Sequence, residues 1–128
     1  HPVCAAVALR NIELMEEREL FAHAAAVSEP FQSRLRRLAD HPLVGNARGV
    51  GMIGAVELVA NKDKKTPFDP AQGVGPYCMA QAEANGLLIR ALGDTVAFCP
   101  PLIVTEDQVH EIFDKFERAL EATLEYLS

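Results

Sequence analysis

The 128-residue sequence lacks long hydrophobic runs, an excess of positive charge and closely spaced cysteines. No apolar run approaches the roughly 20 residues of a membrane-spanning helix, and no signal peptide is visible. The net charge of −6 disfavours nucleic acid and anionic membranes as partners, because both are bound through basic surfaces. Cys4, Cys78 and Cys99 are odd in number and widely spaced, which argues against a disulfide framework or a zinc site. We therefore expect a protein of a reducing compartment, the cytoplasm.

The length and composition of the chain indicate one folded unit. A chain of 128 residues is long enough to bury a core without disulfides or metal. Its 49 % hydrophobic and 23 % charged residues are ordinary for a globular protein. The sequence begins at His1-Pro2-Val3, without methionine and directly in helical sequence, so we expect it to be a piece of a longer protein.

Apolar side chains recur with the 3.6-residue spacing of amphipathic helices in several stretches. The expected helices span residues 2–18, 20–38, 70–85 and 105–127. Pro30 should kink or split the second helix, because proline removes a backbone donor and clashes with the preceding turn. Thr105, with Gln108 three residues later, has the pattern of a capping box and predicts a clear start for the last helix.

The remaining apolar stretches are rich in β-branched residues and show no helical spacing. Residues 44–60 predict one strand, or two strands separated by a break, and residues 61–70 predict an exposed loop. Two short runs, 87–92 and 95–99, flank Gly93-Asp94 and predict a hairpin that Pro100-Pro101 ends. This order of elements predicts an α+β fold in which helices cover a small antiparallel sheet.

A glycine-rich segment, Gly49 to Gly54, matches the GxGxxG pattern of dinucleotide-binding loops. Such a loop opens a helix whose N-terminal amides bind the pyrophosphate, whereas these glycines lead into strand sequence. We interpret them as sites of a bulge or of close backbone packing.

The usual metal ligands and nucleophiles show no reactive arrangement in the sequence. The four histidines share no metal-binding spacing, and no metal-binding residue is predicted. Lys62, Lys64 and Lys65 lie in a polar loop, where a solvated amine does not form a Schiff base readily. Cys99 is expected to be an inert thiol in an apolar strand.

Arg90 is the single cation within the apolar hairpin sequence, and its guanidinium cannot lose its charge. One interpretation is that its planar fork binds the carboxylate of a ligand. The other is that Arg90 extends to solvent or pairs with a structural acid such as Glu57 or Asp94. The residues alone leave both interpretations open.

An ordered series of short segments extends over nearly the whole chain. The segments are His1-Pro2-Val3, Arg48-Gly49-Val50-Gly51-Met52, Gly86-Leu87-Leu88, Gly93-Asp94 and Pro100-Pro101-Leu102. The series resembles the C-terminal part of class III pyridoxal-phosphate-dependent aminotransferases. The resemblance implies that residues 1–18 form an interdomain linking helix and residues 19–128 the C-terminal small domain of a fold-type I transferase. The large domain that binds pyridoxal phosphate would then be absent from this chain.

The resemblance also implies a subgroup, the amine–pyruvate or omega-transaminases. In these enzymes an arginine at the position of Arg90 binds the substrate carboxylate. Ornithine-type members instead carry the arginine three residues before the Pro-Pro pair, where this sequence has Ala97. The implied activity moves an amino group from an amine to a keto acid such as pyruvate.

The same resemblance places the cofactor lysine in the large domain, outside this chain. No catalytic or cofactor-binding residue is therefore expected here, and the chain alone should be inactive. The implied partners are the protein's own large domain and a second subunit in a homodimer or larger oligomer. The alternative is a free-standing α+β ligand-binding or regulatory module, in which Arg90 binds an anionic effector or a structural acid.

Overall fold

Helices and strands follow one another along the chain in the order that the sequence predicts, and the computed structural model describes all residues, 1–128. The α-helices are α1 (Pro2–Glu17), α2 (Leu20–Arg37), α3 (Val74–Ala84) and α4 (Glu106–Leu127). The strands are β1 (Val44–Val50), β2 (Ile53–Leu58), β3 (Arg90–Leu92) and β4 (Thr95–Phe98). Two short 3₁₀ helices, η1 (Leu38–Asp40) and η2 (Pro70–Gln72), follow α2 and precede α3.

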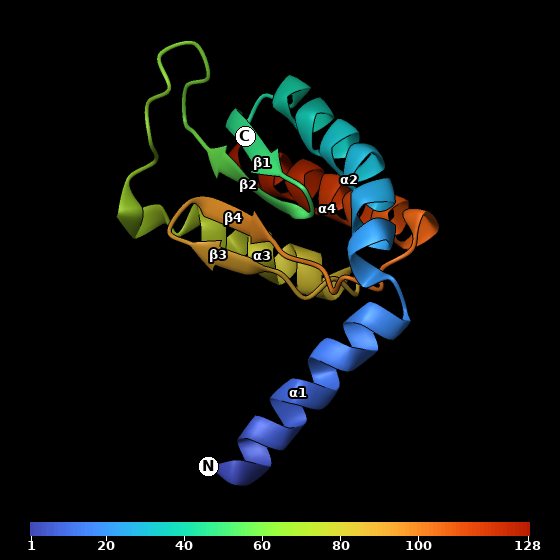
Figure 1. The fold of residues 1–128 in the computed structure, drawn as a ribbon. Coiled ribbons are helices and arrows are strands. Elements are labelled where there is room, and N and C mark those ends of the chain that lie inside the picture. Colours follow the sequence, from blue (N-terminus) through green and yellow to red (C-terminus); the bar gives the residue numbers. More distant parts are fainter.

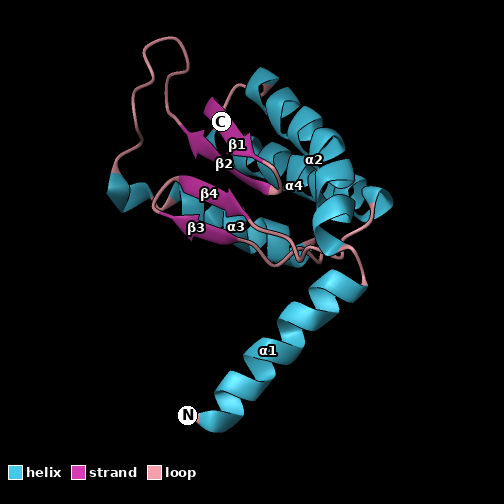
Figure 2. Cartoon of the chain, in the orientation of Figure 1, coloured by secondary structure: helices cyan, strands magenta, loops and turns pink.

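The strands form one antiparallel sheet in the order β1-β2-β4-β3 (Figure 2). Two hairpins, β1–β2 and β3–β4, lie side by side through the pairing of β2 with β4. Helices α2, α3 and α4 pack against one face of this sheet (Figure 1). The predicted α+β fold is confirmed, and residues 44–60 form two strands with a tight turn between them.

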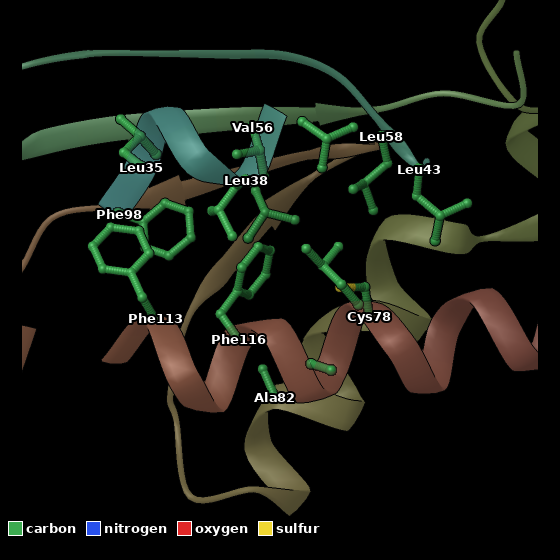
Figure 3. Packing of buried hydrophobic residues seen from close by; sticks show 14 of the residues in the cluster. Leu35, Leu38, Leu43, Val56, Leu58, Cys78, Ala82, Phe98, Phe113 and Phe116 are labelled. Atoms are coloured by element: carbon green, nitrogen blue, oxygen red, sulfur yellow. The ribbon is translucent and has the colours of Figure 1, made fainter. Parts of the chain in front are cut away.

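The core lies between the sheet and helices α2, α3 and α4 (Figure 3). Phe113 of α4 stacks on Phe98 of β4 with ring centroids 5.3 Å apart, and it meets Phe31 of α2 edge-on at 5.2 Å. Phe116 meets Phe98 edge-on, with ring centroids 4.9 Å apart. Burial of each large apolar side chain stabilises the fold by about 1.5–3 kcal/mol, so these rings are the main attachment of α4 to the sheet.

The glycines of the GxGxxG pattern bring the β1–β2 hairpin close to α2. Gly49 and Gly54 pair across the hairpin beneath Leu35, and a Cβ atom at Gly54 would lie 2.6 Å from Cδ2 of Leu35. Gly51 occupies the turn with a φ of +57°, which glycine adopts readily. The predicted close packing is confirmed, whereas the irregularity of β1 lies elsewhere, between Val44 and Asn46.

Two helix boundaries differ from the prediction. Helix α2 runs through Pro30 without interruption, so the predicted split is wrong. Proline deprives only the carbonyl of Ala26 of its partner, and Ala26 is exposed, so water can bind that oxygen. Helix α3 begins at Val74 rather than Pro70, because Gly73 adopts a left-handed conformation with a φ of +58° and separates α3 from η2.

Helix α1 projects away from the rest of the chain and buries none of its residues (Figure 1). One side of α1 is polar, because Arg10 forms ion pairs with Glu13 and Glu17. Apolar side chains on the rest of its surface are exposed, among them Val3, Val7 and Ile12. None of the helices combines the length and the apolar composition that crossing a bilayer requires.

His41 lies just after η1, where burial lowers its pKa below the ordinary histidine value. Its Nδ1 accepts a hydrogen bond from the backbone N–H of Leu43 at 3.2 Å. Its Nε2 lies 3.6 Å from a carboxylate oxygen of Glu121, which raises the pKa, and Lys62 lowers it again. The neutral ring is therefore the form that the fold favours.

We expect the free energy of unfolding to fall as the pH drops below about 6.5, the ordinary histidine pKa. The unfolded chain then binds a proton that folded His41 takes up only at lower pH, so acid shifts the equilibrium toward unfolding. His41→Asn keeps an acceptor for the Leu43 N–H and should reduce the dependence of the free energy of unfolding on pH below about 6.5. Urea unfolding between pH 5 and 8 measures the difference, with His1→Gln as the control. Identical profiles for wild type and His41→Asn would contradict the expectation.

Candidate functional site

The sheet has an open face, which is the side opposite to helices α2, α3 and α4. Because side chains alternate along each strand, the register assigns every second residue to this face. The open face comprises Asn46, Arg48, Val50, Ile53, Ala55, Glu57, Arg90, Leu92, Thr95 and Ala97. Three apolar members are largely exposed: Val50 at 77 %, Ile53 at 60 % and Leu92 at 54 %.

Arg90 begins β3, at one edge of the sheet, and its side chain is exposed. It belongs to a row that crosses all strands in the order Arg48, Ala55, Ala97 and Arg90. The two central alanines are small, so the surface between the two arginines carries little side-chain bulk.

No acid of the chain pairs with Arg90. Glu57, one proposed partner, accepts a hydrogen bond from Nη1 of Arg48 instead. Asp94, the other, accepts a hydrogen bond from the backbone N–H of Gly75 at 2.9 Å. The structural ion pair considered from the sequence is therefore not formed, and the guanidinium of Arg90 faces the exterior without a carboxylate from its own chain.

An open groove of about 440 Å³ adjoins Arg90. Its other lining residues are mostly apolar: Leu87, Leu88, Ile89, Ala97, Phe98, Cys99, Pro100, Pro101 and Ile112. The pairing of β3 with β4 ends at Arg90 and Ala97, shortly before Pro100 and Pro101, which have no N–H to donate. The groove therefore begins where the two strands stop forming hydrogen bonds.

Ala97 is the direct cross-strand partner of Arg90. The two positions that the family resemblance implies as alternative sites for a carboxylate-binding arginine thus face each other on the open face. Directly opposed side chains in an antiparallel pair have Cβ atoms about 4.5–5.5 Å apart, so a guanidinium from either strand reaches the same region. This relation could have been found from the Gly93-Asp94 turn, because a two-residue turn that joins Leu92 to Thr95 sets the register.

The cysteines differ from the prediction at one position. Cys99 is exposed and lines the groove, so its assignment as an inert core thiol is wrong. It follows Phe98, the last residue of β4, and alternation directs it away from the core that Phe98 enters. Cys78 of α3 is the buried thiol, and burial raises its pKa to about 11 despite a hydrogen bond with Thr123.

The lysines do not fit the role of a cofactor-binding amine. Nζ of Lys62 donates to the backbone carbonyls of Ala39 and His41, at the C-terminal end of η1. Nζ of Lys115 pairs with Glu111 at 2.6 Å, while the other two lysines are exposed in the loop before η2. A Schiff-base lysine needs a desolvated amine free to react. The Schiff-base lysine for a pyridoxal phosphate group would therefore have to come from outside this chain.

Comparison with known families agrees with this fold. The family model described as Aminotransferase class-III matches residues 1–120. The chain belongs to the class III aminotransferase family.

Two curated relatives illustrate the similarity. The putrescine–pyruvate aminotransferase of Pseudomonas aeruginosa is 44 % identical over 124 residues, which are 96 % of this chain and 27 % of the relative. A probable mitochondrial gamma-aminobutyrate transaminase 3 of Oryza sativa subsp. indica is 39 % identical over 128 residues, 100 % of this chain and 25 % of the relative. The chain thus spans about a quarter of the length of these relatives.

Solved transaminase structures share the fold. A transaminase with L-alanine superposes with a TM-score of 0.95 at 46 % identity, covering 100 % of this chain and 30 % of the other. The omega transaminase of Pseudomonas jessenii in complex with PMP gives a TM-score of 0.92 at 46 % identity, covering 98 % of this chain and 28 % of the other. The small four-stranded sheet with its helices is thus a part of larger transaminase chains.

The burial of the three cysteines predicts how they react with a thiol reagent. We expect Cys4 and Cys99 to react with 5,5′-dithiobis(2-nitrobenzoate) in the folded chain, because both are exposed. Cys78 should react only after denaturation, because it is buried and its raised pKa keeps the thiol protonated at pH 8. The absorbance of the released thiolate counts the cysteine thiols that have reacted. Cys99→Ser should lower by one the number of thiols that react quickly in the folded chain. Fast reaction of all three thiols in the folded chain would contradict the burial of Cys78.

Proposed function

We propose that this chain forms the C-terminal small domain of a class III aminotransferase and that Arg90 binds the carboxylate of its keto-acid substrate. One observation carries the proposal: an exposed guanidinium without an acid of its own chain lies on the open face of a domain from this family. Membership of the family supports this function over a free-standing ligand-binding or regulatory module.

The chemistry of the proposed site follows from the guanidinium. Two N–H groups of Arg90 would donate in parallel to the two carboxylate oxygens, which fixes the orientation of the keto acid. Pyridoxal phosphate, bound by the rest of the enzyme, would supply the electron sink for amino-group transfer. The chain itself would contribute substrate binding and no catalytic residue, so we expect it to be inactive alone.

The proposed substrates are an amine donor and a keto acid such as pyruvate. Two observations support this choice: Ala97 stands at the position where ornithine-type enzymes carry their arginine, and one relative is a putrescine–pyruvate aminotransferase. The long flexible stem of Arg90 would let the guanidinium turn aside when an amine without a carboxylate occupies the same pocket.

The proposed domain organisation assigns residues 1–18 to an interdomain linking helix and residues 19–128 to the small domain. The exposed apolar side chains of α1, such as Val7 and Ile12, would then pack against a large cofactor-binding domain. We propose that the complete enzyme is cytoplasmic and a homodimer or larger oligomer, as the family resemblance implies.

Arg90→Ala in the full-length enzyme should raise the KM for pyruvate by about 10- to 100-fold, because a charge-assisted hydrogen bond contributes about 1.5–3 kcal/mol. Amination of the cofactor by benzylamine, which has no carboxylate, should change by less than about twofold. The KM for pyruvate of Arg90→Lys should lie between those of wild type and Arg90→Ala, since lysine keeps the charge but loses the planar fork. Stopped-flow measurement of each half-reaction separates the effects.

Arg48→Ala is the matched control, because Arg48 lies in the same row at the opposite edge of the sheet and pairs with Glu57. It should leave the KM for pyruvate unchanged. An equal loss in both half-reactions of Arg90→Ala would show that Arg90 is structural. Complete absence of transamination by the wild-type full-length protein would favour the free-standing module instead.

A further inference from the structure

The segment that carries Arg90 is attached to both ends of helix α3. At the C-terminal end, Gly86 adopts a φ of +77° and terminates the helix. The N–H of Gly86 donates to the carbonyl of Glu83 at 2.8 Å, and the N–H of Leu87 donates to that of Ala82 at 2.9 Å. These two bonds form a Schellman motif, which fixes the direction in which the chain leaves the helix.

At the N-terminal end of α3, Asp94 holds the turn of the β3–β4 hairpin. Its Oδ1 accepts a hydrogen bond from the backbone N–H of Gly75, the second residue of the helix, at 2.9 Å. The carboxylate thereby also lies at the positive end of the helix dipole. A Cβ atom at Gly75 would lie 1.9 Å from the carbonyl oxygen of Gly93, so helix and turn are in direct backbone contact.

Between these attachments, β3 has little support of its own. It contains three residues and pairs with β4 alone, because it is the edge strand. A slip of one residue in this pairing would turn Arg90 from the open face toward the buried face. The turn sets the register, and Asp94 is the residue that ties this turn to α3.

We propose that Asp94 is a positioning residue for Arg90. By joining the hairpin turn to the N-terminus of α3, it holds the main chain of Arg90 in the register that directs the guanidinium to the open face. The side chain of Arg90 stays free of acids, while its main chain is fixed through both ends of one helix. This inference rests on the proposed role of Arg90 in binding a carboxylate.

The test uses Asp94→Ala in the full-length enzyme. We expect the KM for pyruvate to rise about 5- to 20-fold, because a displaced Arg90 guanidinium no longer aligns with both oxygens of the substrate carboxylate. Amination of the cofactor by benzylamine should change by less than about twofold, since that amine makes no use of Arg90. Asp94→Asn keeps an oxygen that accepts the Gly75 N–H and should restore the KM to within about threefold of wild type.

Asp69→Ala is the matched control. Oδ1 of Asp69 also accepts a backbone N–H at the start of a helix, from Ala71 at 2.9 Å, but the bond lies in η2 and not in the hairpin. It should leave both half-reactions unchanged. If Asp94→Ala does not fold, as judged by thermal unfolding, Asp94→Gly replaces it, because Gly-Gly also suits a two-residue hairpin turn and has no side-chain oxygen for the Gly75 N–H. It should show the same selective rise in KM.

Three results would overturn the inference: an unchanged KM for pyruvate in folded Asp94→Ala, an equal loss in both half-reactions, or a loss in Asp94→Asn as large as in Asp94→Ala. Failure of the proposed function gives a different result, because Arg90→Ala itself would then leave the KM for pyruvate unchanged. A selective effect of Arg90→Ala without one of Asp94→Ala would refute only the positioning role.

Discussion

Antiparallel strands alternate their side chains between two faces, and helices cover only one face of this sheet. The rest of the structure depends on this one-sided burial. Val96 and Phe98 of β4 enter the core, and Phe98 is enclosed by Phe113 and Phe116 of α4. A shift of β4 by one residue would remove these apolar side chains from the core. The packing of Phe98 therefore determines which residues remain on the open face.

The same constraint explains why Arg90 is available for binding. A guanidinium directed into the core would need a buried partner, because desolvation of an unpaired charge is very costly. On the open face it needs none, and the nearby acids are engaged with other groups: Glu57 with Arg48 and Asp94 with the N–H of Gly75. Because both acids are engaged elsewhere, the positive charge of Arg90 lies unpaired beside an apolar groove. That combination suits a small carboxylate with an apolar body.

Glycine allows the helices to approach the sheet closely on its covered side. Gly54 admits Leu35 of α2, and Gly75 brings α3 against the carbonyl of Gly93. On the open face and on α1, by contrast, several apolar side chains are largely exposed. The chain spans about a quarter of the length of its curated relatives. The covered side thus stabilises the fold itself, and the uncovered surfaces are those that we propose to contact the rest of the enzyme.

The sequence by itself determined the order of the helices, the β3–β4 hairpin and the α+β class, and it left open whether residues 44–60 form one strand or two. These follow from local physics: apolar spacing, the capping box at Thr105 and the turn at Gly93-Asp94. It also singled out Arg90, because one permanent charge in apolar sequence needs an explanation. Only the tertiary structure decided that Arg90 has no acid partner, that Cys99 is exposed and that Asp94 binds the start of α3. Those outcomes depend on contacts between residues far apart in the chain. The packing of the whole core sets the geometry of these contacts, so the local spacing of residues does not predict them.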